Sequence, residues 1–344
     1  MGKGPCRMAW DPRGPVRRLL EAMGKAAEGV ATDLLSDTVT LECCPGCGGR
    51  GTKKLPPPEH WIGETFFGGG SWGLEHCRTC DLVFTNPRPS ENLLSRFYSA
   101  DGYTPHQSDY NSRRLVAYFA SRMEHYQPAL KSSGHFLDYG CGGGSLLAEC
   151  VARNWCASGY DVALPAVRAC RARGLDVTNN PGSLPSPVDA IMMCHSLEHV
   201  SRVEEPLATF ARILKRDTGR LFIAVPNARS LRAFLSPPLM TRLVGAEERY
   251  QAFPIHLSHF SRKSLRRLLA RHGFECVAVD TYSFGIDAYF RESSSPPPAP
   301  VERAADPRPV SQSGLKADVK RVIKGVFMGA GLGENLFGVF RRAG

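Results

Sequence analysis

Apolar and polar positions along the chain follow two different periods. Residues 90–98 and 109–131 carry apolar side chains at the spacing of amphipathic helices. After residue 134, short apolar runs typical of buried strands alternate with segments of helical period, which predicts a parallel α/β sheet. The expected strands are 135–139, 157–160, 175–178, 190–194, 220–225, 274–280 and 334–341, and the expected helices between them are 145–153, 164–173, 206–214 and 261–271.

The segments outside this alternation differ from it in composition. The first 40 residues are rich in Gly, Pro and basic residues, and a later stretch is rich in Pro and Ser. We expect a flexible basic extension over 1–40, a loop-rich module over 41–85 and a helical connection covering the active site over 86–131. The sheet domain is expected over 132–285 plus 330–344, with a lid-like insertion over 228–260. Between its two parts we expect a linker over 286–314 and a basic amphipathic helix over 315–329.

Composition narrows the class of protein. The chain has 344 residues, of which 42% are hydrophobic, enough to bury a sizeable core. No stretch approaches the roughly 20 apolar residues of a membrane helix, and no apolar block typical of a secretory signal begins the chain. Twelve cysteines are too few for a disulfide scaffold of this length. We therefore expect a cytoplasmic chain without a transmembrane segment.

The charge balance favours anionic partners. Lys and Arg number 43 against 33 Asp and Glu, a formal net charge of +10. Such a charge suits nucleic acid, a membrane surface or a phosphorylated substrate, and does not decide among them.

Two Cys-x-x-Cys pairs lie in the module 41–85. Cys44 and Cys47 form the first pair, and Cys77 and Cys80 form the second. Each pair places two thiolates on one tight turn, and two facing turns complete a tetrahedron for zinc. The spacing predicts a structural Zn²⁺ site, with free thiols or a redox pair as the alternative.

A glycine-rich turn follows the first expected strand of the sheet. Asp138 is followed by Gly140, Gly142 and Gly144, and an expected helix comes directly after. Glycine is required where a backbone approaches a ligand without an intervening Cβ. Asp161 ends the next strand, where a Rossmann-like sheet holds a carboxylate for ribose hydroxyls. The pattern therefore predicts a nucleotide-cofactor site, and a purely structural turn or a nicotinamide site is the alternative.

The acid-x-Gly-x-Gly-x-Gly motif resembles that of the class I S-adenosylmethionine-dependent methyltransferases. Asp138, Gly140, Gly142 and Gly144 match it residue by residue. The resemblance implies a Rossmann-like, seven-stranded α/β sheet with an N-terminal zinc ribbon, and S-adenosyl-L-methionine as cofactor. It also implies that the glycine loop holds the methionine part of the cofactor, that Asp138 reaches its ammonium and that Asp161 binds its ribose.

The resemblance also assigns roles in cofactor binding and catalysis to four further residues. His195 follows the fourth strand at a position that commonly lines the cofactor, and Glu198-His199 resembles an acid–histidine pair of zinc-ribbon sugar methyltransferases. That resemblance implies that His199 is a general base oriented by Glu198. His256 lies where such enzymes often carry a histidine and is expected to touch substrate. The alternative for Glu198-His199 is that the pair only packs the start of the next helix, and the alternative for His256 is that it holds the lid in place.

The sequence indicates the class of methyl acceptor less directly than it indicates the cofactor. Amine methylation of bases usually requires an Asn/Asp-Pro-Pro-aromatic sequence after the fourth strand, and this chain has Cys194-His195-Ser196-Leu197 there. We therefore expect an enzyme that methylates carbon or oxygen of a small polar metabolite, such as a sugar or nucleotide sugar, in the biosynthesis of a natural product or surface polysaccharide. An RNA methyltransferase whose zinc ribbon binds RNA is the alternative.

Overall fold

The computed structural model describes residues 37–56, 72–99, 113–230, 253–282 and 331–344. The predicted linker and amphipathic helix, most of the predicted extension and most of the predicted lid lie outside these ranges. Within them, none of the helices combines the length and the apolar character needed to span a membrane.

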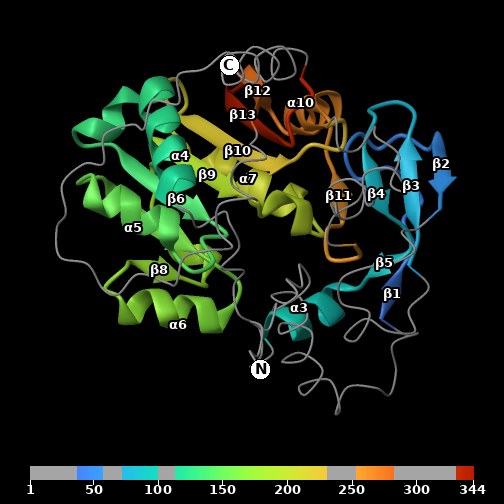
Figure 1. Ribbon diagram of the computed structural model, residues 1–344, viewed down its shortest axis with the longest axis horizontal. Helices are drawn as coiled ribbons and strands as arrows, with labels where there is room; N and C mark the ends of the chain where they lie inside the picture. Colours follow the sequence, from blue (N-terminus) through green and yellow to red (C-terminus); the bar gives the residue numbers. More distant parts are fainter. Residues whose placement is uncertain (1–36, 57–71, 100–112, 231–252, 283–330) are drawn as a thin grey trace, which may run out of the picture.

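A seven-stranded mixed sheet forms the centre of the molecule (Figure 1). Its strand order is β12-β13-β10-β9-β6-β7-β8. The strands from β10 to β8 are parallel, and β13 is antiparallel to both β10 and β12. The strand bounds are β6 His135–Tyr139, β7 Cys156–Tyr160, β8 Val177–Thr178, β9 Ala190–Cys194, β10 Arg220–Pro226, β12 Phe274–Tyr282 and β13 Asn335–Arg342. The predicted Rossmann-like fold with seven strands is therefore confirmed.

Helices cover both faces of the sheet, and two of them depart from the predicted bounds. Pro128 has no amide hydrogen to continue a helix, so the predicted helix 109–131 is divided at Gln127. The helix predicted at 206–214 begins at Glu204, because Pro206 is tolerated in a first turn. The helices are α3 Glu91–Ser99, α4 Arg113–Tyr126, η2 Pro128–Lys131, α5 Ser145–Ala152, α6 Leu164–Ala172, η3 Pro181–Ser183, η4 Leu197–His199, α7 Glu204–Ile213 and α10 Arg262–Arg271.

The strand period of two divides the core into two apolar layers. In β9, Ala190 and Met192 pack with α4 and α5, whereas Ile191 and Met193 pack with α7 and α10. All four side chains are fully buried. Both faces of the central strands are therefore covered, as the continuous apolar runs predicted.

A second sheet lies beside α10 (Figure 1), with the first cysteine pair before its first strand and the second pair at the turn between β3 and β4. Its order is β11-β4-β3-β2, with bounds β2 Thr52–Leu55, β3 Leu74–Cys77, β4 Val83–Thr85 and β11 Ser258–His259. A separate pair joins β1 Thr38–Val39 to β5 Arg88–Pro89. Because β11 comes from the segment between β10 and α10, the small sheet is built from two segments that lie far apart in the sequence.

The small sheet and the large domain share one apolar core. Leu82, which directly precedes β4, and Phe84 of β4 belong to the same buried cluster as Phe210 of α7 and Leu269 of α10. Polar contacts reinforce this packing, since the Arg267 guanidinium donates to the Thr79 carbonyl at 2.9 Å. The cysteine-bearing module is therefore an integral part of the fold.

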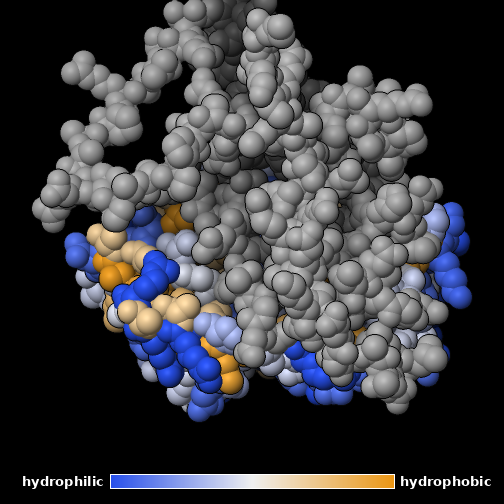
Figure 2. Space-filling model, turned by 60° about the horizontal axis from the view of Figure 1, so that its bottom comes forward, coloured by the Kyte–Doolittle hydropathy of each residue, from blue (hydrophilic) through white to orange (hydrophobic). Residues whose placement is uncertain are grey.

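Hydrophilic residues make up much of the described surface on the face in Figure 2, with hydrophobic residues between them. The exposed large hydrophobic side chains belong to separate segments of the described chain: Val39, Val151, Val162, Leu164 and Val277. Isolated exposed apolar side chains of this kind are normal on a protein surface.

Candidate functional site

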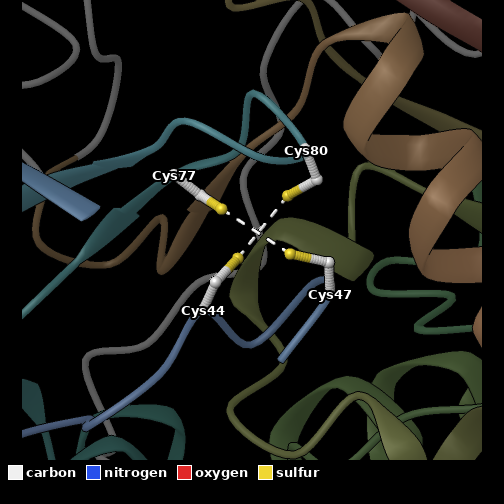
Figure 3. A group of neighbouring side chains, drawn as sticks. All are labelled: Cys44, Cys47, Cys77 and Cys80. Atoms are coloured by element: carbon white, nitrogen blue, oxygen red, sulfur yellow. Dashed lines mark hydrogen bonds between the residues drawn. The ribbon is translucent and has the colours of Figure 1, made fainter. Parts of the chain in front are cut away.

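The four cysteines of the two Cys-x-x-Cys pairs point toward one centre (Figure 3). The Sγ atoms of Cys44 and Cys80 are 3.5 Å apart, and those of Cys47 and Cys77 are 3.6 Å apart. All four sulfurs lie within 4.8 Å of one another. The two turns thus bring together all four predicted ligands.

The electrostatics of this cluster favour a cation. The hydrogen bond between Cys44 and Cys80, with Cys44 as the donor, is followed by burial in raising the pKa of the Cys44 thiol, and the same hydrogen bond lowers the pKa of Cys80. One thiolate is therefore easily formed, but further thiolates would repel it in a buried site. A Zn²⁺ ion removes that repulsion and is bound by four thiolates in structural sites, so the cluster could hold zinc.

The glycine loop has a conformation that requires glycine. Gly140, Gly142 and Gly144 have φ angles of 81°, 52° and 72°. A Cβ on Gly140 would lie 2.6 Å from the Cβ of Ser196, so the loop contacts the connection that follows β9. A Cβ on Gly143 would meet nothing within 4 Å among the described residues. The loop is therefore packed at Gly140 and open at Gly143, as a ligand cradle requires.

Asp161 braces the glycine loop from the end of β7. Its Oδ2 accepts a hydrogen bond from the Gly142 amide and its Oδ1 accepts one from the Ala163 amide, each at 2.8 Å. Burial raises the pKa of this carboxyl, and the two amides oppose that shift. Asp161 thus joins the first and second βα connections of the sheet; its role toward a ribose stays a prediction.

Asp138 is a buried carboxylate at the end of β6. It is 1% exposed, and its Oδ1 has no hydrogen-bond partner among the described residues. Burial, together with the negative charge of Asp161, raises the pKa of Asp138 to about 8. A cationic ligand would compensate this charge, because an unpaired buried carboxylate is costly.

These observations fit S-adenosylmethionine. The cofactor brings an ammonium group suited to the unsatisfied Asp138 oxygen, and the glycine loop leaves open space at Gly143 beside it. The residues expected to hold it, Asp138, Gly140, Gly142, Gly144 and Asp161, all lie at the carboxyl ends of β6 and β7. That edge of a doubly wound sheet is where ligands bind.

His195 lies at the end of β9 with a φ angle of 51°. Its Nε2 is 2.9 Å from the Tyr282 hydroxyl, and its Nδ1 is 3.5 Å from Oε1 of Glu198. The ring therefore bridges β12 and η4. The sequence did not indicate Tyr282 as a partner of His195, and the cofactor-lining role of His195 stays a prediction.

Glu198, His199 and His256 form one cluster beside the glycine loop. One ligand atom of each lies within 4.8 Å of those of the other two. The ring centroids of His199 and His256 are 4.6 Å apart, and the angle between the ring planes is 78°. Nδ1 of His199 is 3.2 Å from the Tyr98 hydroxyl. The structure thus brings His256 against Glu198 and His199, which lie far from it in the sequence, although the catalytic roles of all three stay predictions.

His256 is positioned by the cysteine-bearing sheet. The Thr85 hydroxyl donates to the His256 carbonyl at 3.0 Å, and the Leu257 amide donates to the Glu198 carbonyl at 2.8 Å. The next histidine, His259, has a pKa lowered to about 3 by burial and by His199. Sequence reasoning did not find Thr85, because a lone threonine at a strand end carries no chemical signal.

The comparisons with known proteins agree with this geometry. Residues 106–279 match the family described as "Methyltransferase domain", which is just over half of the chain. No curated protein was found to match the sequence. The chain belongs to the methyltransferase-domain family, and it is an S-adenosylmethionine-dependent methyltransferase.

Many solved structures are also similar to the chain. A SAM-dependent methyltransferase from Archaeoglobus fulgidus is 20% identical, with 66% of this chain and 94% of that chain covered and a TM-score of 0.43. A methyltransferase from Mesorhizobium loti is 13% identical, with coverage of 66% and 98% and a TM-score of 0.40. Magnesium protoporphyrin IX methyltransferase from Synechocystis PCC 6803 is 16% identical, with coverage of 50% and 78% and a TM-score of 0.37. Because these scores are below 0.5, the assignment rests on the family match.

Proposed function

We propose that the protein methylates a small polar metabolite, such as a sugar or a nucleotide sugar, on carbon or oxygen. The observation that carries this proposal is the cluster of Glu198, His199 and His256 beside the glycine loop. Ser196, which contacts Gly140, comes two residues before Glu198, so the loop and the cluster are neighbours.

The proposed chemistry is a proton removal coupled to an in-line displacement. S-adenosylmethionine, when bound, supplies an electrophilic methyl group on a sulfonium. The acceptor loses a proton to Nε2 of His199, and the electron pair of the broken bond to hydrogen forms the new bond to the methyl carbon. The bond between sulfur and the methyl group breaks at the same time, and its electron pair would stay on the sulfur of the departing S-adenosylhomocysteine. A carbon acceptor would need a neighbouring carbonyl to make that proton acidic.

The surroundings of His199 support the role of a base. The phenol oxygen of Tyr98 is placed to accept the Nδ1 hydrogen of His199, which leaves the lone pair on Nε2. Glu198 stabilises the imidazolium that forms, and His256 lies against the same ring, where it would contact the substrate. Positioning and proton removal are the two contributions that this chain would make.

The net charge of +10 supports an anionic acceptor. A diphosphate group on a nucleotide sugar would suit it. The site must then accept a charged small molecule and exclude water during transfer.

The experiment is a screen for release of S-adenosylhomocysteine with sugars, nucleotide sugars and RNA as acceptors. We expect turnover with a sugar-type acceptor and a loss of kcat of about 100-fold or more in His199→Gln, with unchanged affinity for S-adenosylmethionine. The matched control is His125→Gln, an exposed histidine on α4. Turnover of RNA alone, with a steep salt dependence, would contradict the proposal.

A further inference from the structure

The cluster of Glu198, His199 and His256 also has the composition of a metal site. Glu198 and His199 come from η4, and His256 comes from the segment that precedes β11. The ligand atoms of all three lie within 4.8 Å of one another, which is the same limit that the four cysteines satisfy. One carboxylate and two imidazoles are a common donor set for Zn²⁺ and other divalent transition ions.

Glu198 supplies an independent sign of a missing cation. It is 1% exposed, and neither of its carboxylate oxygens accepts a hydrogen bond from the described part of the chain. Its ion-pair neighbour there is Nδ1 of His195, at 3.5 Å. A carboxylate buried in this way is costly unless a positive charge lies against it.

Nδ1 of His199 has the kind of outer hydrogen-bond partner that is typical of a metal-ligating histidine. This atom is 3.2 Å from the Tyr98 hydroxyl, and a hydrogen bond from Nδ1 to that oxygen would fix the tautomer with a lone pair on Nε2. Metal-ligating histidines characteristically have such an outer partner for the other ring nitrogen. His256 is 9% exposed, so two of the three ligands are shielded from water.

We infer that Glu198, His199 and His256 bind a divalent first-row transition ion of the Zn²⁺ class, at a site separate from the four cysteines. The ion coordinates the lone pair on Nε2 of His199, which is the lone pair that would accept the proton of the methyl acceptor. Binding therefore inhibits methyl transfer reversibly, a consequence that rests on the function proposed above.

The direct test is a Co²⁺ titration of the full-length protein whose cysteine site already holds zinc. We expect one equivalent to give weak visible absorption without the intense sulfur-to-cobalt charge-transfer band of a thiolate site. Glu198→Gln and His256→Gln should each weaken Co²⁺ binding by roughly ten-fold or more, and His125→Gln should leave it unchanged.

Two results would overturn the inference. One is the absence of saturable absorption, or absorption with the charge-transfer band. The other is equal affinity in the wild-type protein, Glu198→Gln and His256→Gln, provided that melting temperatures show all three to be folded.

The inhibition is tested with the acceptor found in the screen. We expect added Zn²⁺ to slow the wild-type enzyme and a mild chelator to restore its rate while the cysteine-bound zinc stays in place. A rate that rises with Zn²⁺ would contradict both the inhibition and the base role of His199. If no acceptor is turned over, the function proposed above fails, and the cobalt titration still decides whether the ion binds.

Discussion

The Thr85 hydroxyl donates a hydrogen bond of 3.0 Å to the carbonyl of His256, 171 residues further along the chain. Thr85 is fully buried at the end of β4, in the sheet that carries Cys77 and Cys80. Through this bond the cysteine-bearing module holds one of the three residues beside the glycine loop. The module is thus a support for the site as well as part of the core.

Replacing Thr85 with Val should lower stability and the rate of methyl transfer without changing the affinity for the cofactor. The valine keeps the shape and leaves the His256 carbonyl without this donor, which costs about 1–3 kcal/mol of stability and several degrees of melting temperature. We expect kcat to fall by roughly ten-fold, with unchanged affinity for S-adenosylmethionine measured by calorimetry. Thr85→Ser retains the hydroxyl and is the matched control, so an equal loss in both variants would contradict this role.

The cysteine site should hold one zinc per chain. Cys44, Cys77 and Cys80 are fully buried in the main core cluster, so loss of the ion should disturb the core itself. We expect Cys44→Ser to lose the zinc in elemental analysis and to lower the melting temperature by about 10 °C. The neighbouring Cys43 is exposed, and Cys43→Ser should behave as the wild-type protein.

Gly140 and Gly143 of the glycine loop should respond differently to substitution by alanine. Gly140 combines a φ angle of 81° with a Cβ position 2.6 Å from Ser196, so Gly140→Ala should cost about 1 kcal/mol or more and weaken cofactor binding. At Gly143 a Cβ meets nothing within 4 Å among the described residues, so Gly143→Ala should leave thermal stability unchanged. Equal destabilisation of both variants in thermal melts would show that the loop has another conformation.

Asp138 should make the stability of the cofactor-free protein depend on pH. Its pKa of about 8 in the folded protein is far above the ordinary value of 3.8, so the folded state holds the proton more tightly than the unfolded state. The stability from this group is complete below pH 3.8 and is lost as the pH rises through 8. The melting temperature of Asp138→Asn relative to the wild-type protein should therefore increase between pH 5 and 9. A constant difference would mean that Asp138 is already charged and paired.

The sequence predicts local structure well where the pattern is local. The strand that ends at Asp138 and the loop that follows it could be placed, because an apolar run and three glycines at fixed spacing are visible in one short segment. The interruption of the second predicted helix at Gln127 was missed, although Pro128 marks it. Helical period alone does not distinguish one long helix from a helix followed by a turn.

Contacts between distant segments could not be predicted from the sequence. The pairing of β11 with β4, the Tyr98–His199 bond and the Thr85–His256 bond each join residues more than 100 positions apart. None has a pattern of its own, since a tyrosine on a helix or a threonine on a strand is common. The tertiary fold selects these partners, so a single sequence could indicate the chemistry of the cluster but not what holds it in place.

Calorimetric titration of the purified protein with S-adenosylmethionine, and separately with a reduced nicotinamide cofactor, tests the central claim most directly. We expect saturable binding of S-adenosylmethionine with one site per chain, weakened about 10- to 100-fold in Asp138→Asn, and no binding of the nicotinamide cofactor. Binding of the nicotinamide cofactor alone, or equal affinity for S-adenosylmethionine in Asp138→Asn, would contradict the assignment of the glycine loop and Asp138 to this cofactor.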